Sequence, residues 1–243
     1  MSNVVTIIDL IRNGTITSQI AATMWAAVDR GLSIVVVAIP RFAGKTTMSN
    51  AILSLLPPEI NVHRLSGEEE EMDKLKDAAT GGYLVVGEFS KAPVPHYIWG
   101  SPVRLVFDIL SVGYSLATAL HASGLEETFD VICKGNGVSD EAASRIDLML
   151  YIRRFGADID SFSRRLSEVH EIDYIQDGKP HARQLFQWLE DSDVFEQVDI
   201  PKFIHGDESE LAERTATIEY LANTGQRKPQ DVARLVVEYR SNL

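Results

Sequence analysis

The pattern with the clearest chemical use in this chain is Gly44-Lys45-Thr46-Thr47, which stands between a strongly apolar run and the start of a helix. A turn of this kind leaves backbone amides free at the positive end of a helix, where they bind phosphate. Lys45 would reach the β- and γ-phosphates of a nucleotide, and the Thr46 hydroxyl would coordinate magnesium. The sequence therefore predicts a phosphate-binding loop, with contacts from Arg41, Ala43, Gly44, Lys45, Thr46 and Thr47.

The loop departs from the usual pattern at two positions. Ile39 stands where the motif has a glycine, and Phe42 stands where many such loops have another. A phenylalanine adopts positive φ only at a cost, so the loop should either take another conformation or bind nucleotide poorly. Arg41 either touches phosphate or compensates for the lost glycines. The alternative is an ordinary strand–turn–helix in which Lys45 is a solvated lysine, and the sequence leaves both open.

Three further side chains could act on a bound phosphate. Glu88 ends an apolar run at residues 83–89, where a carboxylate can hold the metal or polarise an attacking water. His121 ends a second run, at 116–121, where a neutral imidazole could contact the γ-phosphate. Glu68 could act as a base if its loop turns inward. Each residue also has an alternative without a catalytic role. Glu88 could face solvent at the strand end, His121 could be a hydrogen-bonded core histidine, and Glu68 could belong to a solvated helix start.

An alternation of strands and helices should position these groups. Apolar runs rich in β-branched residues are typical of strands buried on both faces of a parallel sheet. The strands are expected at 34–39, 60–65, 83–89, 116–121 and 148–153. The helices are expected at 17–30, 44–56, 68–79, 103–110 and 125–133, with a loop at 93–102.

The chain then changes character. Residues 165–174 and 183–188 alternate around the hairpin signal Asp177-Gly178, which predicts an antiparallel meander at one sheet edge. Arg164 and Arg165 should alternate faces there, so that only one can point toward a nucleotide. We expect a three-layer α/β/α domain over residues 1–200 and an appendage of two amphipathic helices over 201–243.

Composition narrows the function classes. The net charge of −12 over 243 residues disfavours nucleic-acid binding. The single cysteine excludes both an internal disulfide and a multi-cysteine zinc site, which suits a reducing compartment. Neither a signal peptide nor an apolar run of about 20 residues is visible. We therefore expect a cytoplasmic protein, with peripheral contact at the inner face of the membrane left open.

Six blocks, in order, resemble the motor domain of the type II/type IV secretion ATPases, most closely the archaeal pilus and archaellum branch. The fourth block resembles that family's Walker B strand, the fifth its histidine box and the sixth its arginine–glutamate-valine strand. The six blocks are Leu10–Thr17, Ala21–Trp25, Gly44–Ile52, Val85–Glu88, Gly113–Ala122 and Arg164–Val169.

The sequence also departs from that family. In the region that matches its acidic box, Leu65–Glu69, the acid is displaced. Tyr114 replaces the first histidine of the histidine box, and Ser90 or Lys91 stands where an arginine is expected. The family's amino-terminal domain is not among these residues. Such losses are expected of a specialised relative with an altered phosphate loop.

The resemblance implies a RecA-like P-loop ATPase that couples Mg-ATP hydrolysis to assembly or export by a pilus-type machine. ATP and Mg²⁺ would be its cofactors, with Thr46 and Glu88 on the metal and Glu88, His121 and Glu68 as catalytic candidates. Its partners would be further copies of itself, in the family's hexameric ring, and membrane-embedded secretion or pilus proteins. The alternative is a non-catalytic relative that serves as a structural or regulatory subunit.

Overall fold

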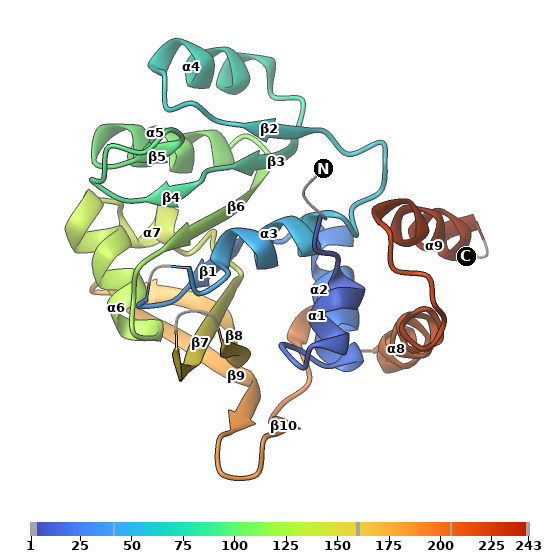
Figure 1. Cartoon of the computed structure of the whole chain (residues 1–243). Helices are drawn as coiled ribbons and strands as arrows, with labels where there is room; N and C mark the ends of the chain where they lie inside the picture. Colours follow the sequence, from blue (N-terminus) through green and yellow to red (C-terminus); the bar gives the residue numbers. More distant parts are fainter. Residues whose placement is uncertain (1–3, 41, 159–160, 205, 242–243) are drawn as a thin grey trace.

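The computed structural model describes residues 4–40, 42–158, 161–204 and 206–241. Within these residues, eight strands form one mixed sheet that has helices on both faces, and two short strands form a second sheet (Figure 1). The chain is therefore an α/β protein, as the alternation of apolar runs predicts.

The main sheet has a parallel part and an antiparallel part. The parallel strands lie in the order β2 (Val62–Arg64), β3 (Gly82–Val85), β6 (Tyr114–Leu120), β1 (Ile34–Val37) and β7 (Leu148–Asp158). The antiparallel part continues from β7 through β8 (Ser161–Gln176), β9 (Lys179–Leu189) and β10 (Val194–Gln197). The predicted edge meander is confirmed. Its hairpin turns at Asp177 and Gly178, whose φ values of 54° and 71° suit a tight two-residue turn.

Each face of the sheet has its own hydrophobic cluster. Ile34 and Val36 of β1 face one cluster, whereas Val35 and Val37 face the other. The first cluster is covered by α1 (Ile7–Arg12), α2 (Ser18–Asp29), α3 (Lys45–Leu53), α8 (Glu208–Asn223) and α9 (Pro229–Ser241). The second is covered by α4 (Glu69–Ala78), α5 (Ser101–Leu110), α6 (Leu125–Phe129), the π-helical turn Asp130–Gly135 and α7 (Asp140–Ala143).

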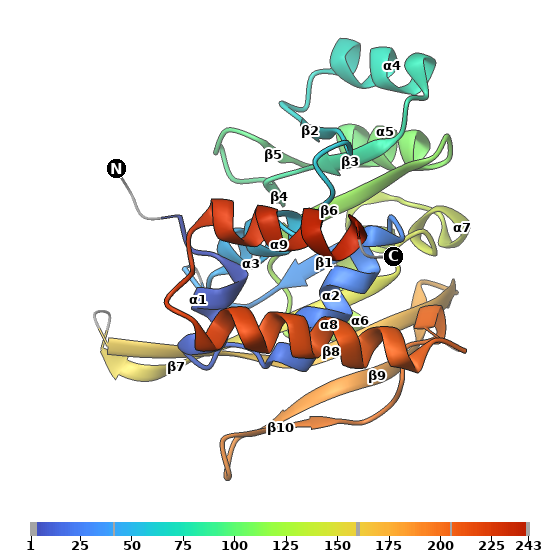
Figure 2. The same ribbon diagram turned by 90° about the vertical axis from the view of Figure 1, so that its right-hand side faces the viewer.

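The two carboxy-terminal helices pack against the main body. Figure 2 shows α8 and α9 running along the side of α1 and α2. Ile218 and Leu221 of α8 and Val232 and Val236 of α9 belong to the same buried cluster as the core of α2. The division at residues 200 and 201 stays a prediction, because shared packing does not establish a domain boundary.

Beyond Val85 the structure differs from the sequence expectation. The strand predicted at 83–89 stops there, and β4 (Glu88–Phe89) pairs in parallel with β5 (Tyr97–Ile98), inside the segment predicted to be loop. The amide of Gly87 donates a hydrogen bond to the carbonyl of His96 at 3.0 Å. A Cβ at residue 87 would lie 2.9 Å from that oxygen, so only glycine permits this close approach. The predicted loop was wrong here.

The described helices include none with the length and apolar content needed to cross a bilayer.

Candidate functional site

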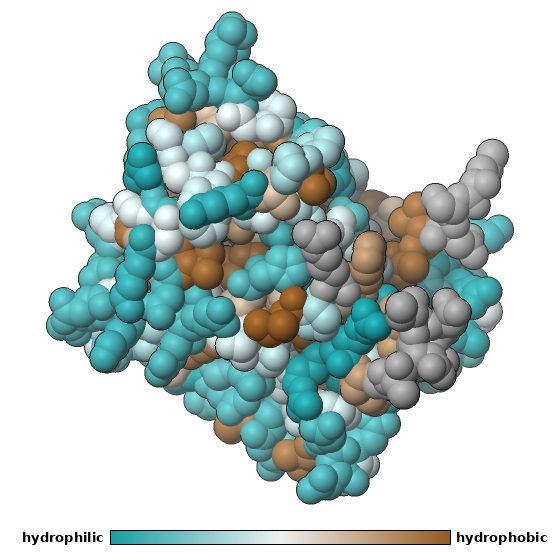
Figure 3. Space-filling view, turned by 60° about the vertical axis from the view of Figure 1, so that its left-hand side comes forward, coloured by the Kyte–Doolittle hydropathy of each residue, from teal (hydrophilic) through white to brown (hydrophobic). Residues whose placement is uncertain are grey.

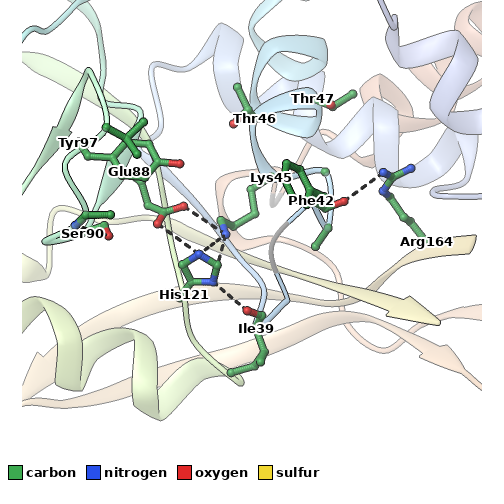
Figure 4. A pocket seen from close by; sticks show the side chains of 14 residues that line it. Ile39, Phe42, Lys45, Thr46, Thr47, Glu88, Ser90, Tyr97, His121 and Arg164 are labelled. Carbon is green, nitrogen blue, oxygen red and sulfur yellow. Dashed lines mark hydrogen bonds and ion pairs between the residues drawn. The ribbon is translucent and has the colours of Figure 1, made fainter. Parts of the chain in front are cut away.

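A cavity of about 730 Å³ opens at the carboxyl ends of β1 and β6 and at the amino-terminal end of α3 (Figure 4). The carboxyl end of a parallel sheet is the usual place for a ligand in an α/β protein. The described lining residues are Ile39, Phe42, Ala43, Gly44, Lys45, Thr46, Thr47, Glu88, Ser90, Ala92, Val94, Tyr97, His121 and Arg164. Five of the six loop contacts predicted from sequence therefore line one cavity, and the sixth, Arg41, lies outside the described residues.

The loop keeps the backbone path that a glycine would take. Phe42 has φ +61° although it is not glycine, and Gly44 has φ +98° at the N-cap of α3. Left-handed φ at such a residue costs about 1–2 kcal/mol. The Phe42 ring is 82% exposed, so it does not fill the cavity. No side chain caps the described first turn of α3, and its amides remain available to an anion.

Lys45, Glu88 and His121 form one cluster at the back of this cavity. Lys45 Nζ lies 3.2 Å from Glu88 Oε2 and 3.4 Å from the His121 ring nitrogens. Glu88 Oε1 lies 3.3 Å from His121 Nε2. Lys45 and Glu88 are buried, with 7% and 3% exposure, while the imidazole is partly open to the cavity. The cluster thus joins the three side chains that the sequence placed at a helix start and two strand ends.

Backbone oxygens fix the orientation of the histidine. His121 Nδ1 lies 2.8 Å from the carbonyl oxygen of Ile39 and 3.1 Å from that of Ala38. A proton on Nδ1 satisfies these acceptors, so Nε2 of a neutral ring is left to accept from Lys45. A protonated ring would instead donate from Nε2 to Glu88.

A magnesium ion fits this cavity only together with a ligand. Thr46 offers an exposed hydroxyl and Glu88 a carboxylate, which are the hard oxygen donors that magnesium prefers. Within the described residues, no three His, Cys, Asp or Glu side chains gather to hold a metal ion. The remaining ligands of the ion would be phosphate oxygens and water, as is usual for Mg²⁺ at nucleotide sites.

Glu68 is not brought into this cavity. It is exposed at the start of α4 and lines a separate surface groove with His63 and Arg64. Glu71 accepts hydrogen bonds from the amide and hydroxyl of Ser66, at 2.8 and 2.7 Å, and so fixes the segment that leads into α4. The inward turn that a catalytic role for Glu68 requires is absent from the described chain.

The two neighbouring arginines of β8 separate as predicted. Arg164 lines the cavity and donates to the carbonyl of Phe42 at 3.1 Å. Arg165 faces away and binds Asp193 through two hydrogen bonds, at 2.7 and 2.8 Å. These bonds, with one from Trp188, lower the pKa of Asp193 to about 2.

One wall of the cavity was not found in the sequence. Ser90, Ala92, Val94 and Tyr97 line the cavity from the β4–β5 segment, and Figure 4 shows Ser90 and Tyr97 on the same side as Glu88. The sequence predicted only a loop at 93–102 and gave none of these residues a role in the site. The one local signal was Gly87, and its meaning depends on its approach to His96, 9 residues further along the chain.

No family model matches the sequence. A relative in Methanocaldococcus jannaschii, the uncharacterized protein MJ1287, is 26% identical over 280 aligned positions that cover 96% of this chain and 97% of the relative. That protein carries no assigned activity, so the likeness extends along the chain without naming a function.

Three solved structures to which the chain is similar are ATPases, namely VirB11 of a type IV secretion system and two DotB proteins. VirB11 from Brucella suis, in complex with sulphate, matches with a TM-score of 0.46 and 16% identity over 70% of this chain and 57% of its own. DotB from Legionella pneumophila matches with a TM-score of 0.40 and 14% identity, and the match covers 89% of this chain and 59% of DotB. DotB from Yersinia pseudotuberculosis matches with a TM-score of 0.41 and 11% identity, and the match covers 88% of this chain and 60% of DotB. The chain spans less than two thirds of each of these proteins. At such TM-scores individual residues do not align reliably, so the chemistry of the site rests on the chain's own geometry.

Proposed function

We propose that this chain is a P-loop ATPase that binds Mg-ATP in the cavity between α3 and the β4–β5 segment. The observation that carries the proposal is the buried cluster of Lys45, Glu88 and His121 directly beneath an uncapped helix start. A buried lysine–carboxylate pair is of little value for stability alone, because desolvation offsets its attraction. A cavity that presents such a pair, free amides and two threonine hydroxyls is suited to a phosphate chain with its cation.

In this proposal the cluster rearranges when the nucleotide binds. Lys45 leaves Glu88 to neutralise the β- and γ-phosphates, and the amides of residues 43–47 donate to the same oxygens. Glu88 is then free to accept from the water that attacks the γ-phosphorus. His121, held by the carbonyl of Ile39, donates or accepts at Nε2 beside the γ-phosphate. Magnesium, when bound, would neutralise charge on the phosphates next to Thr46.

We further propose a RecA-like three-layer motor that couples ATP hydrolysis to assembly or export. This part rests on the sequence blocks that resemble secretion ATPases. It implies a homo-oligomer, a hexameric ring in that family, that works with membrane-embedded secretion or pilus-assembly proteins. The site of action would be the cytoplasm, at the inner face of the membrane, and no nucleic acid would bind. Glu68 stays a catalytic candidate only if its loop moves.

One observation favours the alternative, a non-catalytic relative with a structural or regulatory role. Among the described residues that line the cavity, Glu88 is the sole carboxylate, and Lys45 and His121 already engage it. The same group would have to hold the metal and order the water. A chain that has lost one of two acids would bind nucleotide and turn it over slowly or not at all.

The deciding experiment measures Mg-ATP binding by calorimetry and phosphate release for the wild type, Lys45→Ala and the control Lys74→Ala. Lys74 lies on the exposed face of α4, so its loss should change neither quantity. Binding with turnover that Lys45→Ala abolishes supports the ATPase. Binding without turnover supports the non-catalytic alternative. The absence of binding at millimolar nucleotide also supports that alternative, and it contradicts the ATPase.

A further inference from the structure

The β8 strand contributes a second cation to the cavity. Arg164 lies on the opposite side of Phe42 from the Lys45, Glu88 and His121 cluster (Figure 4). Its Cδ and Nε lie 3.1 Å from the point where a Cβ on Gly44 would stand, so the guanidinium lies against the loop backbone. A larger residue at 44 would displace it. The loop is therefore flanked by two cationic side chains that come from different elements.

Among the residues whose side chains the structure describes, no carboxylate pairs with Arg164. Its Nε is buried and has no hydrogen-bond partner among the described residues, while one terminal nitrogen donates to Phe42. Its carbon Cζ lies 4.4 Å from the centre of the Phe162 ring, and that of Arg154 lies 4.1 Å from the same ring. Burial, and then the charge of Arg154, lower the pKa of Arg164. Leaving a buried charged donor unsatisfied is costly, and an anion would remove that cost.

We infer that Arg164 is a binding residue for the phosphate of the ligand that lies farthest from Lys45, the one that carries the nucleoside. This inference rests on the proposed function and deepens it. A phosphate chain that crosses the loop meets Lys45 at its terminal end and Arg164 at its other end. Because Lys45 and Arg164 lie on opposite sides of Phe42, we expect the site to bind a nucleoside di- or triphosphate more tightly than a single phosphate.

Figure 3 shows one face of the molecule coloured by residue hydropathy, on which hydrophilic residues cover most of the surface and hydrophobic residues form smaller brown patches. Such a surface offers many charged groups that an anion could meet without a site. The experiment therefore needs an arginine on the same hairpin as a control. Arg153 pairs with Glu190 at 2.8 Å and is a neighbour in sequence of Arg154 rather than a lining residue of the cavity.

The test measures dissociation constants of Mg-ATP, Mg-ADP, magnesium tripolyphosphate and competing orthophosphate for the wild type, Arg164→Gln, Arg164→Lys and Arg153→Gln. The loss of a charge-assisted hydrogen bond in Arg164→Gln should weaken the affinity for ATP, ADP and tripolyphosphate by about 10- to 100-fold. The affinity for orthophosphate, which Lys45 would bind, should change by less than about 3-fold. Arg164→Lys keeps the charge but loses the Nε donor, so its affinity for these ligands should lie between those of the wild type and Arg164→Gln.

Each other outcome has a distinct meaning. Equal losses of affinity for all four ligands in Arg164→Gln would show that Arg164 only shapes the loop through Phe42, which overturns the inference. Unchanged tripolyphosphate, or an Arg164→Gln variant equal to Arg153→Gln, would also overturn it. If the wild type binds Mg-ATP and Lys45→Ala does not, these failures leave the proposed function intact. If the wild type binds none of the nucleotides, both this inference and the proposed ATPase function are wrong. Thermal melting curves confirm that each variant is folded.

Discussion

The buried pair of Lys45 and Glu88 gives a sharp test of the site geometry without any ligand. Their nitrogen and oxygen lie 3.2 Å apart, and both side chains are almost fully buried. We consider Lys45→Met, Glu88→Gln and the double variant, each close in volume to the original side chain. If the pair exists in solution, each single change leaves one buried charged group without its partner, and the double change leaves none.

The size of the effect follows from the geometry. At 3.2 Å and an effective dielectric constant of about 20, the attraction is about 5 kcal/mol before desolvation. Removing one member of a buried pair typically costs about 3–5 kcal/mol. His121 remains 3.4 Å from Lys45 and partly compensates, so we expect about 3 kcal/mol for each single variant. The double variant should lose about 1–3 kcal/mol, so the coupling energy between the two residues should be about 3–5 kcal/mol.

Urea unfolding at pH 7.5 measures these free energies, and the exposed pair of Lys74 and Glu70 serves as the control. These two residues lie one helical turn apart, and their side chains are 72% and 83% exposed. Their coupling should not exceed about 0.5 kcal/mol. A coupling between Lys45 and Glu88 that is no larger than this control would refute the described cluster, and with it the structural basis of the proposed site.

Three further outcomes are expected. Phe42→Gly should be more stable than Phe42→Ala by about 0.5–1 kcal/mol in urea unfolding, because glycine adopts the positive φ of this exposed position without strain. If Phe42→Ala is the more stable variant, residue 42 does not have positive φ. Glu68→Gln should leave nucleotide affinity and turnover within about 2-fold, since Glu68 lies outside the cavity; a 10-fold loss would place it in the site. Burial raises the pKa of Asp147 to about 6, so the folded state holds a proton that the unfolded state releases near pH 4. The wild type should therefore lose about 2–3 kcal/mol relative to Asp147→Asn as the pH rises from 4 to 7, measured by denaturation at each pH.

The central parallel strands β1, β3 and β6 could be predicted because each is a mostly apolar run that the sheet buries on both faces. The run Ile34 to Val37 shows this directly, since alternate side chains enter different clusters. The short strands β4, β5 and β10 could not be predicted as separate strands, because two to four residues are too few to show a strand periodicity. At Gly87 the chain leaves the main sheet to meet His96, although the apolar pattern of the sequence continues through Phe89.

The same distinction applies to the site. Lys45, Glu88 and His121 lie at ends of predicted elements, and parallel topology brings the carboxyl ends of strands to one edge of the sheet. The wall that contains Tyr97 follows an irregular path, so its position could not be obtained from periodicity. Which of the two arginines on β8 faces the cavity depends on the register with β7, where Arg154 pairs with Arg164. The sequence alone could state only that the two face opposite ways.

The choice between an active and a non-catalytic ATPase depends on how many roles Glu88 can fill at once. In the described state its carboxylate is occupied by Lys45 and His121, and no second acid lies among the described lining residues. A bound phosphate chain would compete for Lys45 and release one oxygen of Glu88, which makes nucleotide binding and activation of the carboxylate a single event. That coupling favours slow turnover controlled by binding, because the empty cluster is already neutral and paired. Arginine pairs with a carboxylate through two hydrogen bonds, so Lys45→Arg should keep a cation for the phosphates but hold Glu88 more firmly. This variant should therefore lower turnover more than affinity, and equal changes in both would contradict this coupling.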